Sequence, residues 1–244
     1  MPSSTNQIHR GLRSVYFDTS SASFIDGEVG KLLYRGYNIH DLAEKSTYED
    51  VIYLLLYGEL PNRKQLSEIE QTLRTSREIP DEVVQVLELI KNSHPMDALR
   101  TGVSALSAFD PEVNDNSIEA TRRKGIRLTA QAPTIVAAHH RIRQGLQPIQ
   151  PDPELNLAGS FLHMVFGKRP TAEEAQLMDV DFIIHAEHGS NASAFAARVT
   201  ASTVSDLHSA VVTGIGVLKG PWHGGAAESV MKMAQDIGDP ENAE

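Results

Sequence analysis

The spacing of apolar residues along most of the chain is that of amphipathic α-helices. Apolar positions recur at intervals of three and four residues from residue 48 onwards, and Gly or Pro separates several of these runs. Pro133 falls inside the longest run, where we expect a kink or a helix junction. One turn or two of helix is expected over 38–43. The other predicted helices are 48–57, 63–75, 81–91, 95–108, 118–143, 156–166 and 171–184.

A different pattern occurs near the N-terminus. Asp26-Gly27 lies between the apolar segments 24–25 and 32–34, and this arrangement is a strong short-range signal for a β-hairpin. Little other strand is predicted anywhere in the chain. The predicted fold class is therefore mainly α, with a small N-terminal β-hairpin.

The segment 192–219 is rich in Ala, Ser, Thr, Val and Gly. Small side chains let helix axes approach one another closely. The segment therefore packs either in a crowded interior or at a subunit interface, and its composition leaves both interpretations open.

Composition excludes several classes of protein. The formal net charge of −10 over 244 residues argues against a nucleic-acid partner and against binding to an anionic membrane. The chain has no Cys, which excludes disulfides, thiolate metal sites and a cysteine nucleophile. No uncharged apolar run approaches the ~18 residues of a membrane span, and the first ten residues lack an apolar signal region. We expect a cytoplasmic protein.

A basic cluster occupies the start of the long predicted helix. Arg122, Arg123, Lys124 and Arg127 could form an anion-binding patch, or they could lie on a solvated helix face. The net negative charge of the chain and the spacing of the cluster favour the solvated face.

The stretch 218–226 holds a histidine between backbone elements of special geometry. Pro221 fixes its own φ, and Gly224 and Gly225 permit a tight turn and close approach of the backbone to a ligand. A helix is predicted from Ala226 to residue 237, so His223 would lie beside its N-terminus. The helix dipole disfavours an imidazolium there, which predicts a neutral His223. Taken alone, this stretch is also typical of a capped loop whose histidine is structural.

Two other patterns carry no chemistry. His185 and His188 would lie on one helical face and could join His223 around zinc. The sequence supports neither the number of ligands nor the groups that would hydrogen-bond to them, so no metal site is predicted. The glycines at 214, 216 and 220 lack both the spacing and the strand–helix alternation of a dinucleotide loop.

Motifs along nearly the whole chain are similar to those of one enzyme family. The most specific are Glu187-His188 followed by Asn191-Ala192-Ser193, and Gly220-Pro221-Trp222-His223-Gly224-Gly225-Ala226. The segments 26–37, 54–61, 94–101 and 133–137 continue the match. The chain resembles a citrate synthase of the bacterial and archaeal type.

This resemblance implies a large helical domain and a small domain that close over the substrates, in a homodimer or a multiple of it. Residues 1–219 would belong to the large domain, and residues 220–244 would begin the small one. The implied reaction joins acetyl-CoA to oxaloacetate, giving citrate and CoA, without a cofactor. His223 matches the histidine that hydrogen-bonds the thioester carbonyl oxygen, and His188 matches one that binds oxaloacetate. Asn191 would add a polar contact to oxaloacetate, and the hinge would consist of Gly220, Pro221, Gly224 and Gly225.

The family also carries residues that find no match here. A second catalytic histidine in a Gly-His-Arg context, the catalytic aspartate and the arginines that bind oxaloacetate lie beyond the position matching residue 244. Between residues 188 and 244 the basic side chains are Arg198, Lys219 and Lys232, too few for the carboxylates of oxaloacetate and the phosphates of CoA. The sequence therefore predicts a C-terminally truncated or incompletely represented chain that is inactive on its own.

Two alternatives remain open at this point. A 2-methylcitrate synthase would use the same chemistry with propionyl-CoA, and nothing in the sequence separates the two acyl donors. A catalytically incomplete module acting only in oligomer assembly is favoured if the 244 residues are the entire natural protein.

Overall fold

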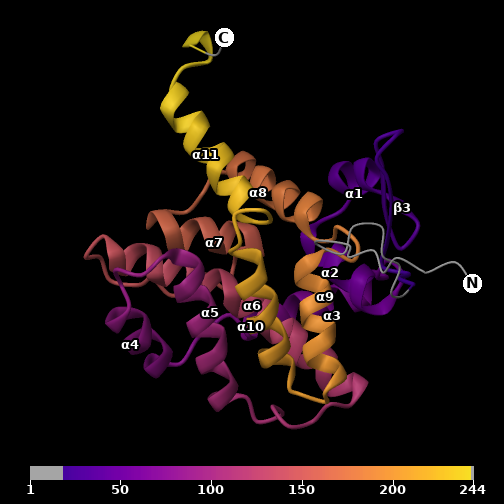
Figure 1. Ribbon diagram of the computed structural model, residues 1–244, viewed down its shortest axis with the longest axis horizontal. Helices are drawn as coiled ribbons and strands as arrows, with labels where there is room; N and C mark the ends of the chain where they lie inside the picture. The colour runs from indigo at the N-terminus through magenta and orange to yellow at the C-terminus, as the bar shows by residue number, and fades with distance from the viewer. Residues whose placement is uncertain (1–18, 243–244) are drawn as a thin grey trace, which may run out of the picture.

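The computed structural model describes residues 19–242, which form a mainly helical body with one small sheet at its N-terminal side (Figure 1). The strands are β1 (Ser23–Asp26), β2 (Lys31–Tyr34) and β3 (Tyr37–Asn38). Two short 3₁₀ helices in this part of the chain are η2 (Ser107–Phe109) and η3 (Pro240–Asn242). The α-helices are α1 (Ile39–Lys45), α2 (Tyr48–Tyr57), α3 (Arg63–Thr75), α4 (Asp81–Leu89), α5 (Pro95–Leu106), α6 (Ile118–Arg143), α7 (Leu157–Phe166), α8 (Ala172–His185), α9 (Ala192–Ser202), α10 (Leu207–Leu218) and α11 (Gly225–Ile237). The predicted fold class is confirmed.

The predicted β-hairpin is formed by β1 and β2, which pair antiparallel with Asp26 opposite Lys31. The Asp26 carboxylate accepts hydrogen bonds from the backbone N–H groups of Glu28 (3.0 Å) and Val29 (3.4 Å), which helps to close the turn. A third strand, β3, pairs antiparallel with β2 and was not predicted. Its two residues are too few to produce an alternating pattern in the sequence.

Helix ends follow the capping chemistry of the sequence. Thr47, Asn62 and Thr171 each form a reciprocal capping box with the residue three positions later. The predicted bounds of α2, α3 and α6 are confirmed, whereas α4 and α5 each end two residues earlier than predicted, at Leu89 and Leu106. The chain after Leu106 tightens into η2 instead of continuing the α-helix.

The longest helix, α6, passes through Pro133 without the junction that the sequence suggested as one outcome. Proline inside a helix costs about 3 kcal/mol because it removes one hydrogen bond and crowds the preceding turn. Ala130 and Ile135, on either side of Pro133, are both 0% exposed. Tertiary packing therefore holds this helix together across the proline.

The interpretation of the basic cluster as a solvated helix face is wrong for Lys124 and Arg127, whereas Arg123 is exposed. Lys124 is 0% exposed, and its Nζ donates to the carbonyl oxygens of Val113 (3.2 Å) and Asp115 (2.6 Å). Arg127 donates to both carboxylate oxygens of Asp110, at 2.7 and 2.9 Å from one guanidinium nitrogen. Basic side chains on α6 thus fasten the preceding loop to the helix, and the carbonyl partners leave no signal in the sequence.

Three apolar clusters hold the body together, and they fix the helices that lead to the predicted site. One joins α4, α5 and α6 and is covered by apolar side chains of α10. Gly102 of α5 permits this packing, since a Cβ there would lie 2.8 Å from Cγ2 of Ile135 on α6. The second joins α2, α3, α6 and the start of α7, and the third joins the sheet, α1, α2 and α8. The ends of α8 and α10 are consequently anchored to the core.

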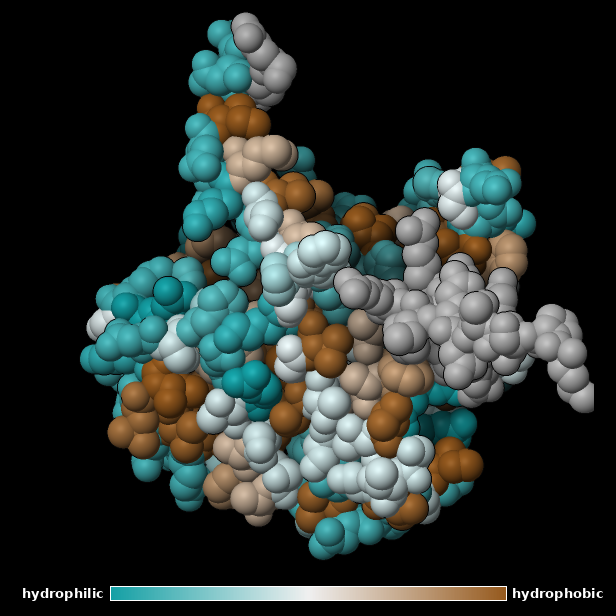
Figure 2. All heavy atoms as spheres, in the orientation of Figure 1, coloured by the Kyte–Doolittle hydropathy of each residue, from teal (hydrophilic) through white to brown (hydrophobic). Residues whose placement is uncertain are grey.

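Small residues pack α9 closely against α10, as their composition predicts. The hydroxyl groups of Thr200 and Thr213 lie 3.1 Å apart across the pair, and a Cβ on Gly214 would meet the Ser193 carbonyl oxygen at 3.6 Å. In Figure 2 the surface over these two helices is mostly pale or brown. Their use at a subunit interface stays a prediction.

Between residues 19 and 242, none of the helices combines the length and the apolar character that crossing a membrane would require.

Candidate active site

The loop that carries His223 joins α10 to α11 and folds tightly on itself. The carbonyl oxygen of Gly220 accepts hydrogen bonds from the backbone N–H groups of His223 (2.9 Å) and Gly225 (3.1 Å). The next helix, α11, starts at Gly225, so the predicted position of His223 beside a helix N-terminus is confirmed. His223 is half-buried, whereas its neighbour Trp222 is 99% exposed. The loop therefore directs the histidine towards the protein and the tryptophan towards solvent.

Glycine is required in this loop by close backbone contact and not by a left-handed conformation. Gly224 has φ −63°, which any residue adopts, but a Cβ there would lie 2.5 Å from the carbonyl oxygen of Leu218. A Cβ on Gly225 would lie 3.1 Å from the carbonyl oxygen of Gly220. The predicted tight turn is present, whereas the predicted approach of this backbone to a ligand stays a prediction.

The His223 ring contacts the first turn of α9. Its Nε2 lies 2.8 Å from the Ser193 hydroxyl, in a part-buried hydrogen bond that joins residues 30 positions apart in the sequence. Ser193 belongs to the family motif Asn191-Ala192-Ser193, and the resemblance assigned it no role. Its available signal was its place two residues after Asn191, a residue type that commonly begins a helix. Ser193 fixes the orientation of the His223 ring.

His188 and Asn191 lie in the loop between α8 and α9. Asn191 is the N-cap of α9, and its side-chain oxygen accepts a hydrogen bond from the backbone N–H of Ala194 at 2.9 Å. His188 is exposed, and its ring centroid lies 6.3 Å from that of His185. Since Ser193 follows Asn191 by two residues, the first turn of α9 brings His223 to the segment that carries both predicted oxaloacetate-binding residues.

The His188 loop is framed by the N-terminal sheet. The Tyr34 hydroxyl donates to the carbonyl oxygen of Ile184 (3.2 Å) and accepts from the backbone N–H of Glu187 (3.2 Å). The Glu187 carboxylate accepts from the Ser23 hydroxyl at 2.9 Å and from the backbone N–H of Gly189 at 2.6 Å. Burial raises the pKa of Tyr34, so the phenol stays protonated and keeps its donor. The sheet and Glu187 together set the course of the chain on both sides of His188.

The match to known proteins decides the family. A family model described as "Citrate synthase, C-terminal domain" matches residues 11–244. The chain belongs to the citrate synthase family.

Relatives within the family include proteins with two different names. The chain is 43% identical over 240 residues to the citrate synthase of Deinococcus radiodurans, which aligns 98% of this chain with 64% of that protein. It is 45% identical over 237 residues to the 2-methylcitrate synthase of Mycobacterium tuberculosis, with 97% of this chain and 60% of that protein aligned. The chain therefore spans less than two thirds of the length of these relatives.

A solved family structure has the same fold. The citrate synthase of Thermoplasma acidophilum, in a ternary complex with carboxymethyl coenzyme A and oxaloacetate, superposes with a TM-score of 0.90 at 30% identity. The alignment covers 96% of this chain and 62% of that one. The citrate synthase-like multi-helical fold predicted from the motifs is confirmed.

Within this family fold, one of the few basic groups near His223 is already paired. The Lys219 ammonium lies 2.6 Å from the Asp97 carboxylate. This pairing reduces the cationic charge available for an anionic substrate, in agreement with the charge argument from the sequence. Among residues 19–242 no group of three or more His, Asp or Glu side chains is arranged to hold a metal ion.

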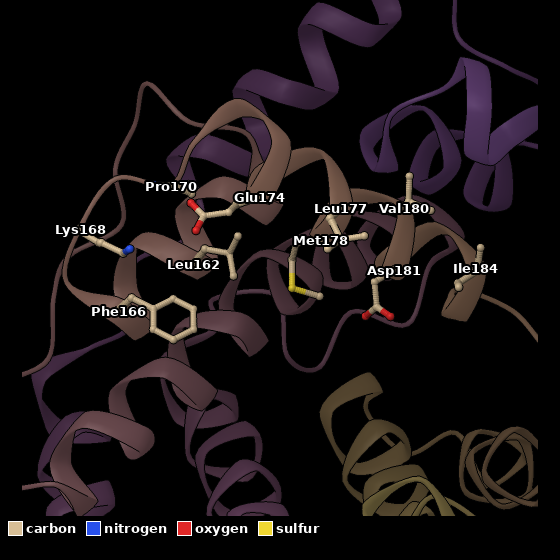
Figure 3. A pocket seen from close by; sticks show the side chains of 10 residues that line it. All are labelled: Leu162, Phe166, Lys168, Pro170, Glu174, Leu177, Met178, Val180, Asp181 and Ile184. Carbon is tan, nitrogen blue, oxygen red and sulfur yellow. The ribbon is translucent and has the colours of Figure 1, made fainter. Parts of the chain in front are cut away.

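The family fold also contains an apolar hollow that is separate from the predicted site residues. It lies between α7 and α8, has a volume of about 580 Å³, and is lined by side chains that include Leu162, Phe166 and Leu177 (Figure 3). Phe166 and Leu177 are 64% and 73% exposed. Its lining is apolar apart from Lys168, Glu174 and Asp181, so it offers a contact surface and not a set of groups for acyl transfer.

Proposed function

We propose that the complete protein is a citrate synthase, which condenses acetyl-CoA with oxaloacetate to give citrate and CoA. The observation that carries this proposal is the Ser193–His223 hydrogen bond of 2.8 Å, made in a loop beside the N-terminus of α11. It orients a histidine in the motif that the family resemblance links to the thioester oxygen. Identity of 43% to a citrate synthase supports the same activity.

The proposed role of His223 requires one tautomer. To hydrogen-bond a thioester carbonyl oxygen, a neutral imidazole must carry its proton on the nitrogen that faces the substrate. When the Ser193 hydroxyl donates to Nε2, the proton resides on Nδ1, which becomes the donor. Enolisation places negative charge on the thioester oxygen, so a fixed donor aimed there stabilises the enolate more than the thioester. The base that removes the methyl proton would be the family's aspartate.

The two other predicted site residues receive roles in oxaloacetate binding. His188 is exposed in the α8–α9 loop, where an imidazole N–H can donate to a carboxylate. The oxygen of the Asn191 amide already caps α9, so we expect its Nδ2 group to make the substrate contact. The name of the Thermoplasma acidophilum complex, which includes oxaloacetate and a coenzyme A derivative, supports these two substrate classes.

We also propose a division into domains at the His223 loop. Residues 1–219 would belong to the large domain and residues 220–244 would start the small one, with Gly220, Pro221, Gly224 and Gly225 as the hinge. The direction of α11, which projects from the helical body in Figure 1, supports a boundary here. Closure about this loop would exclude water from the enol and the thioester.

A second candidate, 2-methylcitrate synthase, is favoured by the 45% identity to the Mycobacterium tuberculosis enzyme of that name. The two reactions differ by one methyl group in the acyl donor, a difference that a pocket discriminates by about 1–3 kcal/mol. Release of free thiol from acetyl-CoA and from propionyl-CoA, each with oxaloacetate, gives two values of kcat/KM. The larger value decides between the two candidates.

The assignment to either reaction is tested with His223→Ala and Ser193→Ala in the complete protein. We expect the loss of His223 to lower kcat at least 100-fold, as removal of one preorganised oxyanion donor does. Ser193→Ala should lower kcat less, because the ring remains but loses its fixed tautomer. Wild-type rates in the His223 variant would refute the catalytic role. The 244-residue chain assayed alone should show no turnover, and turnover by it would refute the expected need for further family residues.

Further proposals concern the state of the protein in the cell. We propose a cytoplasmic homo-oligomer, at least a dimer, with acetyl-CoA as a substrate and no cofactor. Three apolar side chains on α11 are each exposed by more than half, Val230, Met231 and Met233, and they support association with a second copy. Size-exclusion chromatography with light scattering tests this, and a monomer at micromolar concentration would contradict it. If no thiol release occurs while the oligomer persists, the role in assembly alone is favoured.

A further inference from the structure

The segment before His223 is tied to the first turn of α5. The Nζ of Lys219 lies 2.6 Å from one carboxylate oxygen of Asp97, and the other oxygen accepts from Arg100 at 2.9 Å. The Lys219 hydrogen bond holds the pKa of Asp97 below its ordinary value, so this carboxylate is ionised at neutral pH. Both oxygens of Asp97 are therefore used, and Arg100 orients the carboxylate towards Lys219.

The segment after His223 is tied to the same turn of α5. The Nε2 of His94 lies 3.2 Å from the Glu228 carboxylate of α11. The other ring nitrogen, Nδ1, accepts a hydrogen bond from the backbone N–H of Met96, because His94 is the N-cap of α5. A neutral His94 must then carry its proton on Nε2, where it donates to Glu228. This contact is complete without protonation of the histidine.

The Lys219–Asp97 and His94–Glu228 contacts lie on either side of His223 in the sequence. Lys219 precedes it by four residues and Glu228 follows it by five, while His94 and Asp97 are three residues apart at the start of α5. Beyond Glu228, the apolar side chains of Val230, Met231 and Met233 are each more than half exposed, and α11 extends away from the body in Figure 1. The start of α11 is therefore held to the body close to His223.

We propose that His94 and Asp97 are positioning residues for His223, acting through Glu228 and Lys219. This proposal rests on the proposed function for its kinetic consequence but not for its structural one. In this conformation the two contacts hold the ends of the 219–228 segment against α5. The ring of His223 is thereby kept within reach of Ser193. Without them the loop rotates about its glycines, and the donor that faces the thioester oxygen loses its alignment.

Trp222 reports the structural consequence directly. It is the one tryptophan in the sequence, is 99% exposed, and precedes His223 by one residue. Time-resolved fluorescence anisotropy of Trp222 is measured in the complete protein, with any tryptophan outside residues 1–244 replaced by Phe, for the wild type, Lys219→Met, Glu228→Ala and the double variant. Lys232→Met is the control, since it removes an ammonium from α11 that takes part in neither contact. We expect the double variant, but not the control, to show a larger amplitude of fast Trp222 motion.

Kinetics supply the second measurement. Misplacing a catalytic group by about 1 Å can cost on the order of 100-fold in rate, so we expect each single variant to lower kcat about tenfold and the double variant about 100-fold. KM for oxaloacetate should change less than threefold, because His188 lies on another loop. Glu228→Gln keeps an oxygen that accepts from His94, and it should restore most of the rate lost in Glu228→Ala.

These measurements distinguish failure of the positioning proposal from failure of the proposed function. A double variant with the Trp222 anisotropy and kcat of Lys232→Met would overturn the positioning proposal. A complete wild-type protein with no thiol release would overturn the proposed function, and the anisotropy would still decide whether the two contacts hold the loop.

Discussion

Replacing Tyr34 by Phe removes one oxygen atom that joins the sheet to the His188 loop. Tyr34 is 0% exposed, and its hydroxyl is hydrogen-bonded to the Ile184 carbonyl and to the Glu187 N–H, both at 3.2 Å. Phe retains the ring and its packing in the apolar cluster of the sheet, α1, α2 and α8. The change therefore isolates the two hydrogen bonds, with little change in buried apolar area.

The expected magnitude follows from what happens to the two partners. A hydrogen bond contributes about 1 kcal/mol net, and a buried partner left without one costs roughly 1–3 kcal/mol. Ile184 is 38% exposed, so water can rehydrate its carbonyl group. The backbone N–H of Glu187 is part-buried, so water replaces its lost hydrogen bond less completely than it does for the Ile184 carbonyl group. We therefore expect Tyr34→Phe to lower the free energy of unfolding by about 2 kcal/mol.

Urea unfolding at a fixed protein concentration measures this change, and Tyr37→Phe on β3 is the matched control. Tyr37 is 40% exposed, so its variant should stay within about 0.5 kcal/mol of the wild type. Amide hydrogen exchange at residues 187–189 should accelerate in Tyr34→Phe and not in the control. Equal stability and equal exchange in the two variants would show that the sheet does not hold the His188 loop.

Two further predictions concern the core. Burial, followed by the charge of Glu49, raises the pKa of Asp179 to about 6 from 3.8, so the folded state binds more protons than the unfolded state between these values. The free energy of unfolding should therefore fall as pH rises from 3.8 to about 6, by at most about 1.4 kcal/mol per pH unit. Urea unfolding at a series of pH values should show no such contribution in Asp179→Asn. Parallel pH profiles of the wild type and this variant would contradict the prediction. Gly102→Ala places a Cβ 2.8 Å from Ile135 and should destabilise the fold by roughly 1–3 kcal/mol, whereas Gly125→Ala, with its nearest neighbour at 4.0 Å, should be neutral or stabilising in thermal unfolding.

Local signals were sufficient to predict most of the fold. The helix from 63 to 75 has its Asn62 cap, its apolar spacing and its end within one short segment, and each part is readable without tertiary contacts. The hairpin turn at Asp26 is local in the same sense. Lys124 was misinterpreted because its partners are backbone carbonyls of a loop, and any sequence offers such carbonyls. Whether loop carbonyl groups surround a buried ammonium group depends on the tertiary fold.

The candidate site was predicted less completely, and for the same reason. His188 and His223 were identified from motifs, but the groups that orient them are distant in sequence. Ser193 lies 30 residues from His223, and Tyr34 lies 153 residues from Glu187. Hydrophobic periodicity does not encode such pairings, because they arise when separate elements pack together. The motif resemblance therefore located the candidate chemistry, and the fold supplied its geometry.

The two candidate histidines are held by different supports that meet at α9. The sheet, through Tyr34, frames the His188 loop, and α5 fastens the segment that carries His223. The first turn of α9 touches both, since Asn191 ends the His188 loop and Ser193 contacts the His223 ring. Loss of the Tyr34 hydroxyl should therefore act mainly on oxaloacetate binding, whereas loss of the α5 contacts should act mainly on the rate of enolisation. A change in the position of α9 would alter both together, which makes the close packing of α9 on α10 part of the catalytic geometry that we propose.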